Sequence, residues 1–173
     1  MNIEPNLQVA IVDYEMGNLF SVKRVCECIG LNAVITADRS VIMGSDAMIL
    51  PGVGAFSDAM NNLRKLDLVS SINEFIATGK PFMGICLGMQ LLMTESEEFG
   101  NNKGLDIIKG SVVRFPTENS GNKRNKIPQV GWNQIFLPSF ASENFWDNSP
   151  LQNIRNGEFM YFVHSYYPVP ADT

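Results

Sequence analysis

Short apolar runs that alternate with segments of helical periodicity are the feature that most constrains the fold of this chain of 173 residues. Residues 7–12 are nearly continuously apolar, which is typical of a strand buried on both faces of a parallel sheet. A polar loop follows at 13–18, and apolar residues then recur at helical spacing from Leu19 to Ile29. The same pattern predicts strands at 33–36, 47–50 and 81–85 and helices at 56–63, 68–77 and 87–94.

This alternation predicts an α/β fold with a doubly wound, mostly parallel central sheet and flanking helices. After Gly104 the pattern changes, and the second half is richer in β structure, with strands predicted at 111–115, 135–137 and 159–163. A polar loop rich in Asn, Lys and Gly is predicted at 117–126. At this length we expect one domain over residues 1–173.

Charge and composition exclude several classes of function. The chain has 13 Lys and Arg against 18 Asp and Glu, a net charge of -5, which disfavours nucleic-acid binding. It contains neither a leader-like N-terminus nor an apolar run of about 20 residues, so we expect a cytoplasmic protein that does not bind membranes. Three cysteines and one histidine give no disulfide framework and exclude a metal site built on histidines. We expect no metal and no cofactor.

The segment Gly84-Ile85-Cys86-Leu87-Gly88-Met89-Gln90 lies where a strand is predicted to become a helix. Glycines two residues on either side of a nucleophile relieve the crowding of such a turn. The start of the helix would stabilise a thiolate and offer N–H groups to an oxyanion. The pattern thus favours an acyl-transfer cysteine, and a buried cysteine in a glycine-lined strand end is the structural alternative.

A second glycine-rich loop, Pro51-Gly52-Val53-Gly54-Ala55-Phe56, follows another predicted parallel strand. Ligands bind at the carboxyl edge of such sheets, so its N–H groups could face the cysteine and complete an oxyanion hole. An ordinary βα loop is the alternative. The loop lacks the length and the lysine of a phosphate-binding loop.

Together these two motifs resemble those of the class I glutamine amidotransferases, which hydrolyse glutamine and have a flavodoxin-like α/β fold. The resemblance extends to residues 13–19 (Asp-Tyr-Glu-Met-Gly-Asn-Leu), 130–133 (Val-Gly-Trp-Asn) and 161–166 (Tyr-Phe-Val-His-Ser-Tyr). The whole set covers nearly the entire chain and is similar to that of the glutaminase subunits of imidazole glycerol phosphate synthase, in histidine biosynthesis.

The resemblance implies a role for each matching residue. Cys86 is implied as the nucleophile that forms a glutamyl thioester, with the N–H groups of Val53 and Leu87 as oxyanion donors. Glu98 is implied to face the α-amino group of the substrate, L-glutamine. The full set of implied substrate-binding residues is Gly52, Gln90, Glu98, Ser165 and Tyr166.

The implied partner is a cyclase subunit with a (β/α)8 barrel, in a heterodimer. The glutaminase would pass ammonia to this subunit, which converts N1-(5-phosphoribulosyl)-formimino-AICAR-phosphate, PRFAR, into imidazole glycerol phosphate and AICAR. Five residues match positions on the docking face: Gly17, Asn18, Trp132, Asn133 and Tyr161. For Trp132, core packing is the alternative interpretation.

The family's catalytic histidine and glutamate lie in a Phe-His-Pro-Glu segment near the C-terminus, and this segment is absent from the sequence. His164 matches a different family position. We therefore expect that the sequence lacks the family's last strands and helix and that this 173-residue form is inactive. The alternatives are a short protein with a binding or scaffold role and an altered geometry in which His164 is the base.

Three other functions stay open at this point. The chain could supply ammonia to an enzyme that modifies sugars, or it could be a non-catalytic binding subunit. A cysteine hydrolase of the same superfamily is the third, although it would not explain residues 130–133 and 161–166.

Overall fold

The computed structural model describes residues 7–118, 124–142 and 144–171. The chain forms two compact units, one comprising Met1–Arg114 with Tyr166–Thr173 and the other Phe115–Ser165. The single domain predicted from the sequence stays a prediction.

The first unit is built on a parallel sheet of four strands in the order β2-β1-β3-β4. These strands are β1 (Gln8–Val12), β2 (Asn32–Thr36), β3 (Ala47–Leu50) and β4 (Phe82–Gly84). β1 pairs with β2 and β3, and β4 pairs with β3, all in parallel. This is the strand order of a doubly wound sheet, and it confirms the predicted fold class.

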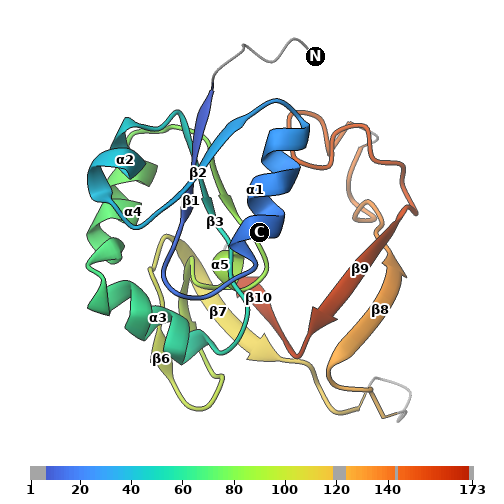
Figure 1. Ribbon diagram of the computed structural model, residues 1–173. Helices are drawn as coiled ribbons and strands as arrows, with labels where there is room; N and C mark the ends of the chain where they lie inside the picture. The colour runs from blue at the N-terminus through green and yellow to red at the C-terminus, as the bar shows by residue number, and fades with distance from the viewer. Residues whose placement is uncertain (1–6, 119–123, 143, 172–173) are drawn as a thin grey trace. The chain divides into compact units, whose positions relative to one another are not determined.

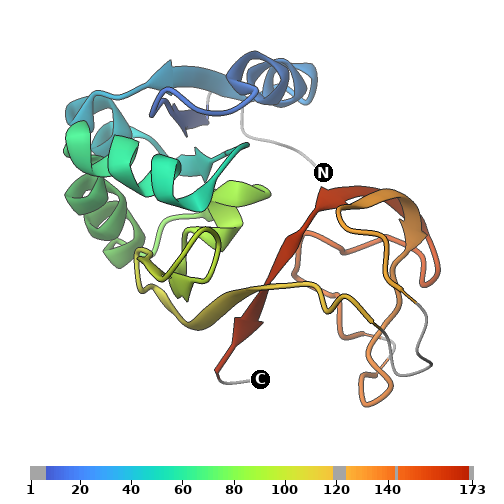
Figure 2. The same ribbon diagram turned by 90° about the horizontal axis from the view of Figure 1, so that it is seen from below.

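Helices cover both faces of this sheet. α1 (Leu19–Cys28) packs on one face, where Ile11 of β1 forms a cluster with Cys26 and Ala33. Ala10 and Val12 point to the opposite face, because successive side chains of a strand alternate. There they join a larger core with α2 (Arg39–Gly44), α3 (Phe56–Lys65) and α4 (Leu68–Ala77). Figures 1 and 2 show these three helices together, on the side away from α1.

Side-chain caps start two of the helices. The Asn18 side chain accepts a hydrogen bond from Ser21 N at 3.3 Å at the start of α1. The Asp38 carboxylate accepts from Ser40 N at 2.6 Å at the start of α2. The sequence pattern does not predict α2, because a helix of six residues is too short to show periodicity, although an aspartate at its start is an N-cap signal.

The first unit also contains a mixed sheet in the order β10-β7-β5-β6. Its strands are β5 (Met93–Ser96), β6 (Asn102–Lys103), β7 (Ile108–Arg114) and β10 (Tyr166–Pro170). The helix predicted at 87–94 is wrong in its second half, because α5 (Leu87–Gln90) ends after one turn and β5 begins at Met93. The chain leaves the helix there because Leu105 N and Ile107 N donate hydrogen bonds to Leu91 O and Leu92 O, at 2.9 Å each.

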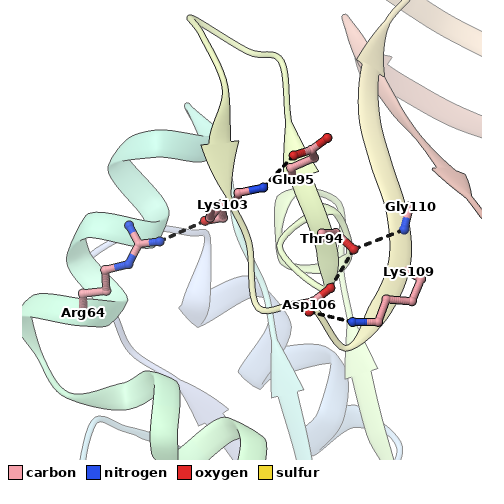
Figure 3. A network of polar contacts seen from close by, with 7 residues as sticks. All are labelled: Arg64, Thr94, Glu95, Lys103, Asp106, Lys109 and Gly110. Atoms are coloured by element: carbon pink, nitrogen blue, oxygen red, sulfur yellow. Dashed lines mark hydrogen bonds and ion pairs between the residues drawn. The ribbon is translucent and has the colours of Figure 1, made fainter.

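A polar network ties this mixed sheet to α3 (Figure 3). Arg64 of α3 donates to the carbonyl oxygen of Lys103 at 2.9 Å, and the Lys103 ammonium lies 2.9 Å from the Glu95 carboxylate. Asp106 accepts from Thr94 at 2.7 Å and from Lys109 at 2.6 Å. The hydrogen bond from Lys109, followed by that from Thr94, lowers the pKa of the Asp106 carboxyl group. The β5–β6 turn that follows Ser96 is thereby held at a defined place beside α3.

The second unit contains an antiparallel pair, β8 (Gln129–Gln134) and β9 (Phe159–His164). The strand predicted at 135–137 is wrong, because β8 ends at Gln134. Backbone hydrogen bonds from Ile135 N to Glu158 O and from Gly157 N to Ile135 O close the ladder there, at 2.9 and 2.8 Å. The predicted strand at 159–163 is confirmed.

Among the residues described, none of the helices has the length and apolar character needed to cross a membrane.

Candidate active site

Three loops of the first unit leave the carboxyl edge of the parallel sheet side by side. Residues 13–18 follow β1, residues 51–55 follow β3, and Cys86 comes two residues after β4. Because β1, β3 and β4 are neighbours in the sheet, their loops meet at one edge, which is where open α/β sheets bind ligands. The fold thus brings together the two glycine-rich motifs that the sequence singles out.

Cys86 occupies a strained turn between β4 and α5. Its backbone has φ 53° and ψ −114°, a conformation that side-chain-bearing residues rarely adopt, and its side chain is exposed. A Cβ at Gly84 would lie 2.7 Å from Met89 Cα, and one at Gly88 would collide with the Leu50 carbonyl oxygen. Both flanking positions therefore require glycine, as the predicted nucleophile elbow does.

Of the backbone N–H groups near this turn, some are hydrogen-bonded within the turn and others are available to an oxyanion. Met89 N and Gln90 N donate to the Cys86 carbonyl oxygen, at 3.1 Å each, and so are engaged within the turn. Within 7–118, 124–142 and 144–171, neither Leu87 N nor Val53 N makes a hydrogen bond. These are the two donors that the resemblance implies, and their assignment stays a prediction.

The glycine-rich loop after β3 is anchored by a tyrosine for which the sequence pattern predicts no role. The fully buried Tyr14 side chain donates its hydroxyl hydrogen bond to Pro51 O at 2.7 Å. Burial raises the pKa of Tyr14, and interaction with the Cys86 thiol raises it further. Gly52 is buried beside this hydroxyl, whereas Val53 is 55% exposed.

The residues implied to bind substrate lie on several elements. Gln90 of α5 donates to the carbonyl oxygen of Tyr166 in β10 at 3.1 Å. Glu98 lies in the β5–β6 turn and accepts a hydrogen bond from Phe56 N, the first amide of α3, at 2.8 Å. Ser165 belongs to the second unit, where its carbonyl oxygen accepts from Phe115 N at 3.0 Å. Their contacts with substrate stay predictions.

The Glu98 contact gives that carboxylate a structural role that the sequence did not indicate. α3 has no side-chain cap from its own N-cap residue, Ala55. The Glu98 carboxylate caps the helix instead, by accepting a hydrogen bond from Phe56 N, 42 residues earlier in the chain. A carboxylate at a helix N-terminus also interacts favourably with the helix dipole. Glu98 therefore fixes the end of the glycine-rich loop, where α3 begins.

The residues predicted to dock a partner are divided between the two units. Gly17 and Asn18 lie in the loop after β1, where Gly17 has φ 124° and Asn18 caps α1. Trp132 and Tyr161 are paired across β8 and β9, with ring centroids 5.6 Å apart at 67°. Both residues are more than half exposed. The alternative interpretation, that Trp132 packs in the core, is therefore wrong.

Trp132 and Tyr161 belong to a larger apolar face of this strand pair. Side chains on one face of a strand recur every second residue, and the exposed apolar residues of β8 and β9 follow this spacing. They are Val130, Trp132, Phe159, Tyr161 and Val163. We call this set the hairpin face. Asn133 also lies on β8 but at the alternate position, so it points to the other side.

His164, the one histidine in the sequence, is packed among aromatic rings in the second unit. Its ring centroid lies 5.0 Å from that of Phe115 and 5.9 Å from that of Phe162. This arrangement supports a packing role for His164.

Comparison with known proteins matches residues 10–170 to the family model for class I glutamine amidotransferases. The chain is 45% identical over 170 residues to the imidazole glycerol phosphate synthase subunit HisH of Geobacter sulfurreducens, covering 95% of this chain and 76% of that protein. It is 44% identical to the HisH subunit of Aquifex aeolicus, covering 96% and 74%.

Solved structures agree on the fold. A structure of PurLQS from Thermotoga maritima matches with a TM-score of 0.63 at 19% identity, over 95% of this chain and 70% of that one. A glutamine amidotransferase crystal structure matches with a TM-score of 0.61 at 15% identity, over 94% and 73%. By its match to the family model and its identity to the HisH relatives, the chain belongs to the class I glutamine amidotransferases and, within them, to the family of imidazole glycerol phosphate synthase HisH subunits.

Proposed function

We propose that this chain is the glutaminase subunit of an imidazole glycerol phosphate synthase and that it hydrolyses L-glutamine through Cys86. The conformation of Cys86 carries the proposal for the chemistry. A strained, exposed cysteine between two positions that require glycine is suited to a nucleophile and costly for a purely structural residue. The relatives named above support the choice of synthase.

Hydrolysis proceeds in two steps on this scaffold. The Cys86 sulfur attacks the side-chain amide carbon of glutamine, a carbon–sulfur bond forms, and the carbonyl oxygen becomes an oxyanion that the N–H groups of Leu87 and Val53 stabilise. The amide nitrogen takes up the proton that the thiol has lost, the carbon–nitrogen bond breaks, and ammonia leaves. Water hydrolyses the thioester to glutamate and the free thiol. We assign none of the proton transfers to His164, which contacts Phe115 and Phe162. The resemblance gives them to the histidine and glutamate of the family's Phe-His-Pro-Glu segment.

The ammonia is used by a second subunit. We place the chain in a heterodimer with a (β/α)8-barrel cyclase that makes imidazole glycerol phosphate and AICAR from PRFAR, in the cytoplasm. Transfer within a complex is required because ammonia released to bulk water is protonated and no longer nucleophilic. The exposed hairpin face supplies apolar and aromatic surface of the kind that interfaces bury at their centres.

Product formation by the mixed subunits tests the function. Combined with the cyclase subunit, a protein that carries these residues together with the family's catalytic histidine and glutamate is expected to form imidazole glycerol phosphate from PRFAR and glutamine. The cyclase alone is expected to need ammonium salt. A complex that uses ammonium but never glutamine would contradict the proposal.

Replacement of Trp132 by alanine is expected to weaken the complex with the cyclase. Central aromatic residues of an interface typically contribute about 2 kcal/mol or more, so we expect the Kd to rise roughly 30-fold. Isothermal titration calorimetry with the purified cyclase measures this change. Phe140→Ala is the matched control, because Phe140 is 82% exposed, packs against Phe145 and does not belong to the hairpin face. Equal Kd values for the wild type and Trp132→Ala would remove the hairpin face from the interface.

Replacement of Glu98 by glutamine is expected to weaken glutamine binding while leaving α3 capped. The amide oxygen of glutamine still accepts from Phe56 N, but the negative charge facing the substrate ammonium is lost. A charge-assisted hydrogen bond contributes about 1.5–3 kcal/mol, so we expect affinity for glutamine to fall roughly 10- to 100-fold by calorimetry.

The neighbouring Glu97 provides the matched control for this change. Its carboxylate also accepts a backbone hydrogen bond, from Arg114 N at 2.6 Å, so Glu97→Gln makes the same chemical change outside the implied substrate site. If both variants lose affinity equally, Glu98 has no specific part in binding the ammonium group.

A further inference from the structure

Tyr14 is a buried polar residue to which the mechanism above gives no role. It lies in the loop after β1, and its side chain is fully buried in the core. Asn62 of α3 donates to its backbone carbonyl oxygen at 3.0 Å, which fixes the residue from the other side. Its hydroxyl group reaches across to the glycine-rich loop after β3 and donates to Pro51 O at 2.7 Å.

Hydrophobic packing alone does not require this hydroxyl group. A phenylalanine ring fills nearly the same volume, and a buried hydroxyl group destabilises the fold unless it is hydrogen-bonded. Here its hydrogen-bond acceptor is a backbone carbonyl of the loop that carries Val53. A tyrosine hydroxyl group is already protonated at neutral pH, and burial raises its pKa further, so it acts as a permanent donor.

A hydrogen bond to Pro51 O fixes more than one atom. The peptide unit is planar, so the Pro51 carbonyl group and the Gly52 N–H group turn together. The next N–H along the chain is that of Val53, the proposed oxyanion donor. Gly52 and Gly54 flank Val53, and Gly54 has φ 105°, so the loop has little conformational restraint of its own.

The hydroxyl group also limits the space available to the loop. A Cβ at Gly52 would collide with the Tyr14 hydroxyl oxygen and would lie 3.0 Å from Gly88 N of the elbow. Gly52 is therefore enclosed between the tyrosine and the turn that carries Cys86. The loop is anchored by Tyr14 at Pro51, where it begins, and by Glu98 at Phe56, where α3 begins.

We propose that Tyr14 is a positioning residue for glutamine hydrolysis, whose hydroxyl group holds the Pro51–Gly52 peptide so that the following Val53 N–H is directed at the developing oxyanion. This inference rests on the proposed glutaminase function. It assigns Tyr14 an effect on the reaction of glutamine-like carbonyl compounds at Cys86 and none on the intrinsic reactivity of the thiol.

Tyr14→Phe tests the inference through two reactions of the same cysteine. The first reagent is 6-diazo-5-oxo-L-norleucine, a glutamine analogue whose ketone occupies the position of the amide carbonyl. The thiolate forms a carbon–sulfur bond to the diazo carbon, which takes up a proton and loses N₂. The second reagent, iodoacetamide, displaces iodide without an oxyanion. Mass spectrometry of the Cys86 peptide measures both rates, with the protein in complex with the cyclase.

We expect Tyr14→Phe to slow labelling by the glutamine analogue about tenfold, the effect of one hydrogen bond, while the iodoacetamide rate changes less than twofold. Hydrogen exchange of the peptide that covers residues 51–55 is expected to be faster in this variant. Tyr167→Phe, which removes a hydroxyl group from β10, is the matched control and should leave the ratio of the two rates at the wild-type value.

A second variant separates positioning from stability. Asn62→Ala removes the hydrogen bond to the Tyr14 backbone and keeps the hydroxyl group, so it should lower the melting temperature without changing the ratio. If the ratio falls in both variants in proportion to their loss of stability, or stays unchanged in Tyr14→Phe, the inference is overturned. A wild-type protein that the glutamine analogue does not label at all would instead overturn the proposed function, and this inference with it.

Discussion

Replacement of Cys86 by alanine is expected to abolish covalent labelling of the protein by 6-diazo-5-oxo-L-norleucine. The residue is exposed and lies at the turn between β4 and α5. Because the sulfur itself forms the bond, its removal leaves no slower route at this site, and we expect the labelling rate to fall by more than about a thousandfold. Intact mass spectrometry of the protein before and after treatment measures the loss of the adduct.

The other exposed cysteine is the control for this experiment. Cys28 is also free and exposed, but it lies near the end of α1, away from the carboxyl edge of the parallel sheet. Cys28→Ala should therefore be labelled at the wild-type rate. An adduct that persists in Cys86→Ala and disappears in Cys28→Ala would show that the site has been assigned to the wrong cysteine.

Replacement of Gly88 by alanine is expected to have the largest effect on stability. The added methyl group would overlap the Leu50 carbonyl group, which belongs to the backbone of a central strand and cannot move aside as a flexible side chain could. We expect the free energy of unfolding to fall by about 3 kcal/mol or more, and the Tm by roughly 6–12 °C. Urea unfolding followed by circular dichroism measures the change.

Gly44 offers a matched substitution in the same unit. It lies at the end of α2, and a Cβ built there meets no other atom within 4 Å. Alanine has the higher helix propensity, so Gly44→Ala is expected to leave stability unchanged or to raise it by up to about 1 kcal/mol. If Gly88→Ala were as stable as Gly44→Ala, the close packing of the elbow against β3 would be refuted.

The parallel sheet could be predicted because its signal is local. β1 and β3 are short, apolar and bounded by loop residues, and such runs predict buried strands without knowledge of their partners. The end of α5 could not be predicted in this way. Leu91, Leu92 and Met93 continue an apolar pattern that suits a helix, and only hydrogen bonds from residues 105–108 show that the chain has left the helix.

The candidate site was predictable where glycine spacing revealed it. Cys86 and the loop at 51–54 were identified because a nucleophile elbow and a close backbone approach need glycines at fixed positions. Tyr14 gave no such signal, since its partner Pro51 is 37 residues away and an isolated tyrosine beside a strand is not distinctive. The cap that Glu98 provides for α3 was invisible for the same reason, because it joins residues 42 positions apart.

The strained backbone of Cys86 also sets a conflict for laboratory evolution of this protein. A side chain at φ 53° and ψ −114° costs on the order of 1–3 kcal/mol, which glycine would not incur. A library screened for heat resistance alone should therefore accumulate glycine at position 86 and lose its chemistry. A screen for thermostabilised variants of this subunit must therefore measure two properties together: heat resistance, and the ability of the host cells to grow in a medium that lacks histidine.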